Sequence, residues 1–302
     1  MPGAAGEFPS GGGSGRQPAR LGAVDDPYAL HRQRRGLFSS DAAAYETGRP
    51  PYPERVYAAL REVCGLGDGT EVVEIGPGTG LATARLLDHG ASVTAVELSA
   101  EFSDRLRAKF AGRPLRVVVG AFEDVALDRA SFDLAVAATS FHWVPTDVGL
   151  RRCAEILRPG GWLALWWNHF GDPDRPDPFR TALTPIFERL APSLVETFPG
   201  AAFQAASGAG AHPWALDTAA RAGEIEASGG FGPVRRETIA WTGRHTAAEL
   251  RTLFASFSPC LALPPDQRAA VLDAIERLAA EEFGGVVERP YLTVLYLASH
   301  RA

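Results

Sequence analysis

The segment from Glu71 to Leu87, EVVEIGPGTGLATARLL, decides the fold. Val72–Ile75 is a short apolar run of the kind found in strands that are buried on both faces. The glycine-rich stretch after it predicts a tight turn, and Leu81–Leu87 predicts the start of a helix. A strand, a glycine turn and a helix in this order are typical of a nucleotide-binding α/β unit.

The spacing of the glycines limits which nucleotide this turn can bind. The glycines are Gly76, Gly78 and Gly80, whereas the dinucleotide fingerprint G-x-G-x-x-G would need a glycine at Leu81. No Gly-Lys-Ser/Thr follows, so the turn is not a P-loop. The pattern acid-x-G-x-G-x-G, which begins at Glu74, fits instead. Glycines let a ligand lie flat against the backbone, and a nearby carboxylate suits an ammonium group.

The rest of the chain alternates strands and helices as far as Asn168, which predicts a doubly wound α/β domain. A carboxylate at the end of the second strand, Glu97, lies 17 residues after Gly80 and can accept both hydroxyls of a ribose. Further strands and helices are expected after residue 230. The expected strands are 72–75, 91–98, 115–120, 131–139, 162–168, 234–243 and 289–299, and the expected helices include 100–110, 147–161, 179–194, 246–257 and 264–283.

Taken together, these motifs resemble the class I S-adenosylmethionine-dependent methyltransferases. The similarity covers residues 45–168 and includes the acid and glycines of the turn, Glu97, the strand end FEDV and the turn LRPGG. The segments DAAAYETGRPPYP and SFHW resemble a bacterial subgroup of small-molecule enzymes, the trans-aconitate-like or methyltransferase type 11 group. The resemblance implies a Rossmann-like, doubly wound, seven-stranded sheet. It also implies an N-terminal helical lid and a cap inserted after the fifth strand.

The same resemblance implies S-adenosyl-L-methionine as cofactor and a set of residues that bind it. Tyr45 and Arg49 would close on its methionyl end, Glu97 would hold its ribose, and Ala121 and Phe122, with Glu123, would line the adenine site. The full expected set is Tyr45, Arg49, Glu74, Gly76, Pro77, Gly78, Thr79, Gly80, Glu97, Leu98, Ala121, Phe122, Thr139, His142 and Trp143.

The candidate catalytic residue is His142, where the acceptor should arrive. A neutral histidine could take a proton from an acceptor hydroxyl or amine. Alternatively, His142 only orients the ligands or packs in the fold. Asn168 and His169, at the end of the fifth expected strand, are further candidates for contacts with the acceptor.

Composition and patterning suggest the domain organisation and exclude several classes of protein. Residues 1–36 are rich in Gly, Pro and Ser and predict a disordered extension, and residues 37–302 predict one methyltransferase domain with a cap at 170–230. A net charge of −6 argues against a nucleic-acid partner, and no apolar run is long enough to span a membrane. The three scattered cysteines show neither a disulfide framework nor metal spacing. We therefore expect a cytoplasmic protein, and the preference for Arg over Lys suggests a GC-rich bacterial genome.

The function expected from the sequence is methyl transfer from S-adenosylmethionine to a small organic acceptor. A protein that binds the cofactor without transferring the methyl group is the main alternative. A nicotinamide oxidoreductase is a weaker alternative because Leu81 occupies the third glycine position of its fingerprint. The acceptor, the atom methylated and the oligomeric state are not readable from the sequence.

Overall fold

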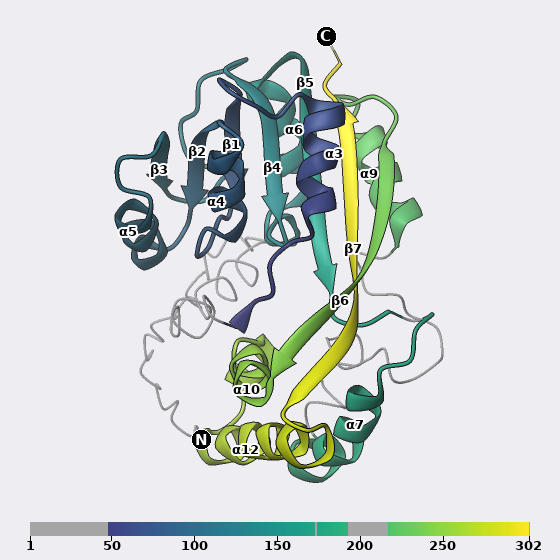
Figure 1. Cartoon of the computed structure of the whole chain (residues 1–302). Helices are drawn as coiled ribbons and strands as arrows, with labels where there is room; N and C mark the ends of the chain where they lie inside the picture. Colours follow the sequence, from purple (N-terminus) through teal and green to yellow (C-terminus); the bar gives the residue numbers. More distant parts are fainter. Residues whose placement is uncertain (1–47, 173, 193–216, 302) are drawn as a thin grey trace, which may run out of the picture.

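The computed structural model describes residues 48–172, 174–192 and 217–301. Its centre is a seven-stranded sheet in the order β3-β2-β1-β4-β5-β7-β6 (Figure 1). Strands β1 to β5 are parallel, and β7 runs antiparallel to both of its neighbours. The strands are β1 (Glu71–Ile75), β2 (Ser92–Glu97), β3 (Leu115–Val119), β4 (Phe132–Ala138), β5 (Leu157–His169), β6 (Arg235–Thr246) and β7 (Val286–Ser299).

Helices cover both faces of this sheet, as expected for a doubly wound fold. One apolar cluster joins the sheet to α3, α4 and α5, and a second joins its other face to α6 and α9. Val72 of β1 belongs to the first cluster and Val73 to the second, which explains why the strand is apolar at consecutive positions. These helices are α3 (Glu54–Cys64), α4 (Leu81–Asp88), α5 (Ala100–Lys109), α6 (Thr146–Ile156) and α9 (Thr218–Ala227).

The expected fold class and the order of its elements are confirmed, and most boundaries lie close to the expected ones. Helix α3 follows Pro53 and ends at Gly65, whose φ of 72° is the left-handed conformation that glycine adopts readily. The helix expected to begin at Asp147 and to be ended by Pro159 and Gly160 ends earlier, at Ile156, because Leu157 is already extended with ψ of 142°. The LRPGG turn therefore belongs to the start of β5 and not to the end of α6.

Beyond the carboxyl ends of the parallel strands, the chain forms a second layer that we call the cap. Strands β6 and β7 are longer than expected, and their outer halves continue past the sheet to the helices of the cap (Figure 1). A third apolar cluster holds this layer together. The cap comprises these outer halves, α7 (Pro178–Leu190), α10 (Ala247–Ala255), α11 (Ser258–Leu261) and α12 (Pro265–Glu282).

The extent of the cap differs from the segment expected after the fifth strand. Of residues 170–230, α7 packs in the cap, whereas α9 packs on the sheet through Ile225. Helices α10 and α12, far later in the chain, complete the apolar cluster around α7. Residues 193–216 of the expected cap and the whole extension 1–36 lie outside the described residues.

Candidate active site

The glycine-rich turn joins β1 to α4 and lies at the carboxyl edge of the sheet. Gly76, Gly78 and Gly80 have φ angles of 65°, 56° and 82°, a region that other residues rarely adopt. A Cβ atom on Gly76 would also lie 2.8 Å from the Cβ atom of Ser140, in the loop after β4. The amide of Gly76 donates to the carbonyl of Val96 at 2.9 Å, which fixes the turn against β2. The glycines are therefore needed to bring two backbone segments together.

The carboxylate of Glu97 lies beside this turn at the end of β2. Its Oε2 accepts a hydrogen bond from the Gly78 amide at 3.1 Å, and its Oε1 accepts one from the Ser99 amide at 2.9 Å. Burial raises the pKa of Glu97, and the backbone hydrogen bonds oppose this shift. Each oxygen keeps accepting capacity, because a carboxylate offers about four lone-pair sites. The side chain is thus fixed in position and can accept further hydrogen bonds.

A second carboxylate, that of Glu74, is almost completely buried beneath the turn, with 1% of the residue exposed. Its Oε2 accepts a hydrogen bond from the Thr83 hydroxyl at 2.6 Å, whereas its Oε1 has no hydrogen-bond partner within the part of the chain that the structure describes. Burial raises the pKa of Glu74 to about 7. A buried oxygen without a partner is costly, and a cationic donor at this point would relieve the cost.

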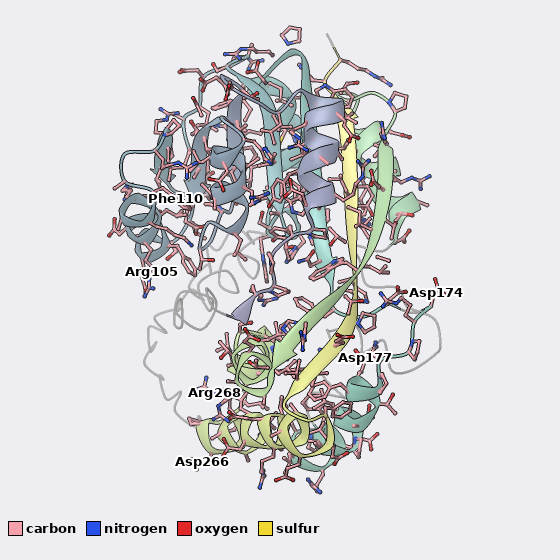
Figure 2. The ribbon with its side chains drawn as sticks, viewed as in Figure 1. Arg105, Phe110, Asp174, Asp177, Asp266 and Arg268 are labelled. Carbon is pink, nitrogen blue, oxygen red and sulfur yellow. The ribbon has the colours of Figure 1, made fainter. Side chains whose placement is uncertain are left out.

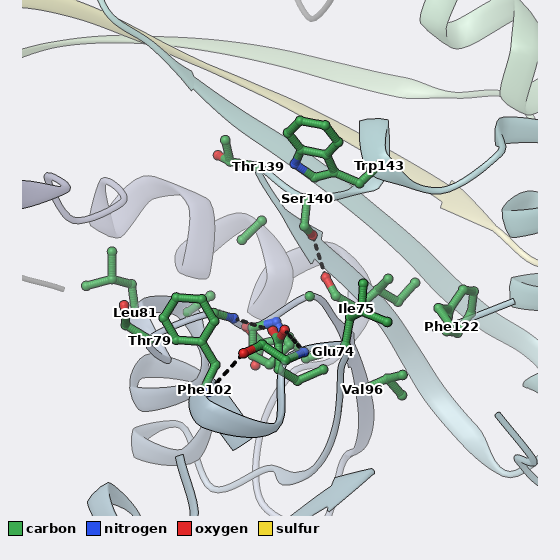
Figure 3. Close-up of a pocket in the computed structure, with 18 of the residues that line it drawn as sticks. Glu74, Ile75, Thr79, Leu81, Val96, Phe102, Phe122, Thr139, Ser140 and Trp143 are labelled. Atoms are coloured by element: carbon green, nitrogen blue, oxygen red, sulfur yellow. Dashed lines mark hydrogen bonds between the residues drawn. The ribbon is translucent and has the colours of Figure 1, made fainter. Parts of the chain in front are cut away.

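These groups face a cavity of about 580 Å³ between the sheet edge and the cap. Figure 3 shows Thr139, Ser140 and Trp143 on one side of the cavity and Thr79 and Phe102 on the other. The residues that line it and that the sequence predicted as site residues are Arg49, Glu74, Gly76, Pro77, Gly78, Thr79, Glu97, Leu98, Ala121, Phe122, Thr139, His142 and Trp143.

The remaining two members of the expected set do not contribute to this lining. Tyr45 lies outside the described residues. Gly80 begins α4 and faces the protein interior, since a Cβ atom there would lie 2.6 Å from the Phe110 ring. This contact indicates that Gly80 allows α4 to pack closely against Phe110. Glu123, expected beside the adenine site, is not among the described residues that line the cavity.

Thr139 adopts an unusual backbone conformation at the cavity wall. Its φ of 56° is rare for a β-branched residue, and its amide donates to the carbonyl of Trp166 at 2.7 Å. The hydroxyl of Tyr52 donates to Thr139 Oγ1 at 3.1 Å. Such strain persists only where surrounding contacts hold it, and it is concentrated at functional sites. Tyr52 was not predicted, although the PPYP segment that contains it was singled out.

His142 is held at the cavity by a neighbour from β5. It lies in the short 3₁₀ helix η2 (Phe141–Trp143), and its Nδ1 accepts a hydrogen bond from Trp167 Nε1 at 3.1 Å. Since an indole nitrogen only donates, this bond assigns the lone pair to Nδ1 and the proton of the neutral ring to Nε2. In this tautomer Nε2 donates hydrogen bonds. The bond favours the orienting role for His142 over the role of a base.

The guanidinium of Arg49 connects the N-terminal segment to the cap. Its Nη2 donates to the carbonyl of Ser256 at 3.0 Å, and its Cζ lies 4.8 Å and 5.5 Å from the ring centroids of Phe257 and Phe170. Both phenylalanines line the cavity and were missed by the sequence reading. No local motif identifies them, because they meet only when the cap folds over the sheet.

The two further candidates at the end of β5 are placed differently from expectation. The Asn168 side chain donates to the carbonyl of Pro51 at 3.4 Å and accepts from the Thr293 hydroxyl at 2.6 Å. Neither Asn168 nor His169 is among the described residues that line the cavity. Asn168 thus ties β5 to β7 and to the segment before α3.

Within the described ranges, the protein has neither a cluster of metal ligands nor a membrane-spanning helix. No group of three or more His, Cys, Asp or Glu side chains there could hold a metal ion. No helix in residues 48–172, 174–192 and 217–301 is long and apolar enough to cross a membrane.

Comparisons with known proteins identify relatives of this sequence and of this fold. Residues 73–165 match the family described as "Methyltransferase domain". An uncharacterized methyltransferase of Mycobacterium tuberculosis is 29% identical over 279 residues, which cover 87% of this chain and 95% of the relative. An uncharacterized methyltransferase of Schizosaccharomyces pombe is 26% identical over 264 residues, or 86% of this chain and 95% of that protein.

A solved structure shows the same fold. It is phosphoethanolamine N-methyltransferase 2 of Haemonchus contortus in complex with S-adenosyl-L-methionine, with a TM-score of 0.53 and 15% identity. The alignment covers 89% of this chain and 60% of that one, so this chain spans only part of its length. The fold and the matched domain define a class I S-adenosylmethionine-dependent methyltransferase. Within that class, residues 73–165 match the methyltransferase type 11 domain.

Proposed function

We propose that this enzyme binds S-adenosyl-L-methionine on the glycine turn and transfers its methyl group to a small organic acceptor beneath the cap. The observation that carries the proposal is the buried Oε1 of Glu74, which has no hydrogen-bond partner in the described part of the chain. The ammonium group of the cofactor is a positively charged hydrogen-bond donor, which is the kind of partner that this oxygen lacks. Glu97, with spare accepting capacity at the next strand end, suits the ribose hydroxyls.

The residues of the turn would position the methionyl and ribose parts of the cofactor. Gly76 lets the turn pack closely against Ser140, Gly78 lines the cavity without a side chain, and Ala121 and Phe122 offer an apolar wall for the adenine. When bound, the cofactor supplies an electrophilic methyl group on a sulfonium, which reacts by in-line displacement. Because the leaving group is already good, the main task of the chain is to hold the reactants in line and to exclude water.

His142 would take part as a hydrogen-bond donor that orients the acceptor. The bond from Trp167 fixes the ring and leaves Nε2–H to donate. An acceptor atom that already carries a free lone pair, such as a carboxylate oxygen, needs no base. This role therefore favours acceptors that are nucleophilic without deprotonation.

A small acceptor is supported by the size and the lining of the site. The cavity has a volume of about 580 Å³, and Arg49, Phe170 and Phe257 line it on the cap side. The Haemonchus contortus enzyme with the same fold is named for a small phosphorylated amine. All three cysteines of the chain are buried and unpaired, which supports a reducing cytoplasmic location.

Calorimetric titration with S-adenosylhomocysteine tests the binding step. We expect one site per chain with a micromolar dissociation constant, lost on Glu97→Ala and retained on Glu101→Ala, an exposed carboxylate on the neighbouring helix. Absence of binding to the wild-type protein would contradict the proposal. Release of S-adenosylhomocysteine in the presence of a panel of small acceptors then separates an enzyme from a protein that only binds the cofactor.

A further inference from the structure

A second, smaller cavity lies inside the cap, next to the main one. It has a volume of about 20 Å³, which is room for about one water molecule. Half of the residues that line it are phenylalanines, among them Phe170 and Phe257. The other lining residues are Leu183, Thr184 and two arginines, Arg180 and Arg289. Two cations beside so small an apolar space are unusual and need an explanation.

One of these cations is fully paired. Arg289 of β7 donates from Nε and Nη2 to the same oxygen of Asp177, Oδ2, at 3.0 and 2.8 Å. The two side chains are only 4% and 3% exposed. The other oxygen of Asp177 accepts from the backbone amide of Arg180 and so caps α7. Figure 2 shows Asp177 beside the outer half of β7, just before α7.

The other cation, Arg180, has no such partner. Its Nε and Nη2 are inaccessible to solvent and make no hydrogen bond within the described residues. Burial and the neighbouring Arg289 lower the pKa of Arg180 to about 10, although Asp177 opposes this shift. The cluster thus contains two guanidinium groups and one carboxylate, which is already engaged. The Arg180 side chain as a whole is only partly buried, but two of its nitrogen donors are inaccessible and lack an acceptor, which is costly, and an anion at this point would remove the cost.

The small cavity is adjacent to the main cavity at the acceptor end. Phe170 and Phe257 line both spaces, and the Arg49 guanidinium lies over both of their rings. The charges of the whole site are therefore polarised. The carboxylates Glu74 and Glu97 belong to the strand ends of β1 and β2, whereas Arg49 contacts Ser256 and Phe257 of the cap and Arg180 and Arg289 line the small cavity inside the cap. This polarity matches a cationic donor and an anionic acceptor.

We propose that Arg180 binds a carboxylate group of the methyl acceptor, which enters the small cavity past Phe170 and Phe257. The planar guanidinium offers parallel donors that match a carboxylate. The space admits about one oxygen atom, so it can take one oxygen of an anionic group, and the comparison with methyl phosphate below distinguishes a carboxylate from a phosphate. This assignment of the acceptor class rests on the proposed function, whereas the binding of the anion can be measured by itself.

The experiment titrates the full-length protein, saturated with S-adenosylhomocysteine, with succinate, glutarate and adipate. Each dicarboxylate is compared with its uncharged diamide, and methyl phosphate serves as the alternative anion. The variants are Arg180→Met, which removes the charge, and Arg180→Lys, which keeps the charge but not the planar group. Arg189→Met is the matched control, because Arg189 is an exposed arginine on the same helix.

We expect at least one dicarboxylate to bind at least tenfold more tightly than its diamide. This preference is lost in Arg180→Met, reduced in Arg180→Lys and unchanged in Arg189→Met. The affinity for S-adenosylhomocysteine remains the same in all four proteins. The melting temperature of Arg180→Met is expected at or above that of the wild type, because the substitution removes an uncompensated charge.

Four results would overturn the inference. Equal binding of the dicarboxylates and the diamides, or equal losses in Arg180→Met and Arg189→Met, would exclude the subsite while leaving the proposed function intact. Methyl phosphate binding as tightly as the dicarboxylates would exclude the carboxylate class. Failure of the wild-type protein to bind S-adenosylhomocysteine would remove the proposed function, and the acceptor assignment with it.

Discussion

The glycine-turn side of the cavity and the cap side are built in different ways. On the turn side, Gly76, Gly78 and Glu97 lie within one strand–turn–helix–strand unit, and the backbone holds the carboxylate. On the cap side, Arg49 and Arg289 are brought to the site from opposite ends of the chain. The comparison teaches that the cofactor half of the site is local in sequence, whereas the acceptor half depends on tertiary packing. The predictions below test each half in turn.

The largest effect is expected from Glu97→Ala on the turn side. The substitution removes a charged acceptor for two ribose hydroxyls, and each such bond contributes about 1.5–3 kcal/mol. We expect the affinity for S-adenosylhomocysteine to fall about 100-fold or more, measured by calorimetry. An affinity within threefold of the wild type would show that the ribose is bound elsewhere.

The next effect is the change of the free energy of unfolding with pH that comes from the buried carboxyl group of Glu74. Its pKa rises from 4.5 in the unfolded chain to about 7 in the folded protein, so the folded state binds the proton more tightly between these values. The contribution of Glu74 to stability is therefore greatest below pH 4.5 and decreases as the pH rises towards 7. The decrease amounts to about 3 kcal/mol, at about 1.4 kcal/mol per pKa unit. Urea unfolding of the wild type and Glu74→Gln from pH 5 to pH 8 measures it.

The raised pKa of Glu74 also predicts that a proton is released when the cofactor binds. An ammonium group next to Glu74 favours the ionised carboxylate, so binding of S-adenosylhomocysteine near pH 6.5 should release a proton. Calorimetry in buffers with different ionisation enthalpies would detect the release, and Glu74→Gln should abolish it. Equal release in both proteins would exclude Glu74 as the partner of the ammonium group.

A smaller effect is expected from Gly76→Ala. The alanine would combine a φ of 65° with a Cβ contact of 2.8 Å to Ser140. We expect a loss of about 2 kcal/mol in the free energy of unfolding, together with weaker cofactor binding. Gly112→Ala is the control, because Gly112 has a φ of 80° but open space around it. If both variants lose equal stability, the contact with Ser140 contributes nothing.

The smallest effect concerns the tautomer of His142. Nitrogen NMR of the ¹⁵N-labelled protein should show Nδ1 without a proton and Nε2 protonated, because Trp167 donates to Nδ1. Trp167→Phe removes this donor and should give a mixture of tautomers. A proton on Nδ1 in the wild-type protein would restore the alternative in which His142 acts as a base.

The same comparison explains what the sequence could and could not predict. The turn and Glu97 were readable because parallel strands place their carboxyl ends at one edge, so spacing alone brings these residues together. The bond between Tyr52 and Thr139 joins residues 87 positions apart, and that between Asp177 and Arg289 joins residues 112 apart. No periodicity encodes such contacts. The extent of the cap was misjudged for the same reason, since α10 and α12 reach it only through the long strands β6 and β7.

The most direct test of the account is a crystal structure of the complex with S-adenosylhomocysteine. The account predicts that the ribose hydroxyls bind the Glu97 carboxylate, that the ammonium group approaches Glu74 Oε1 and that the thioether faces His142. A ligand bound outside the 580 Å³ cavity, or with its ribose away from Glu97, would contradict it.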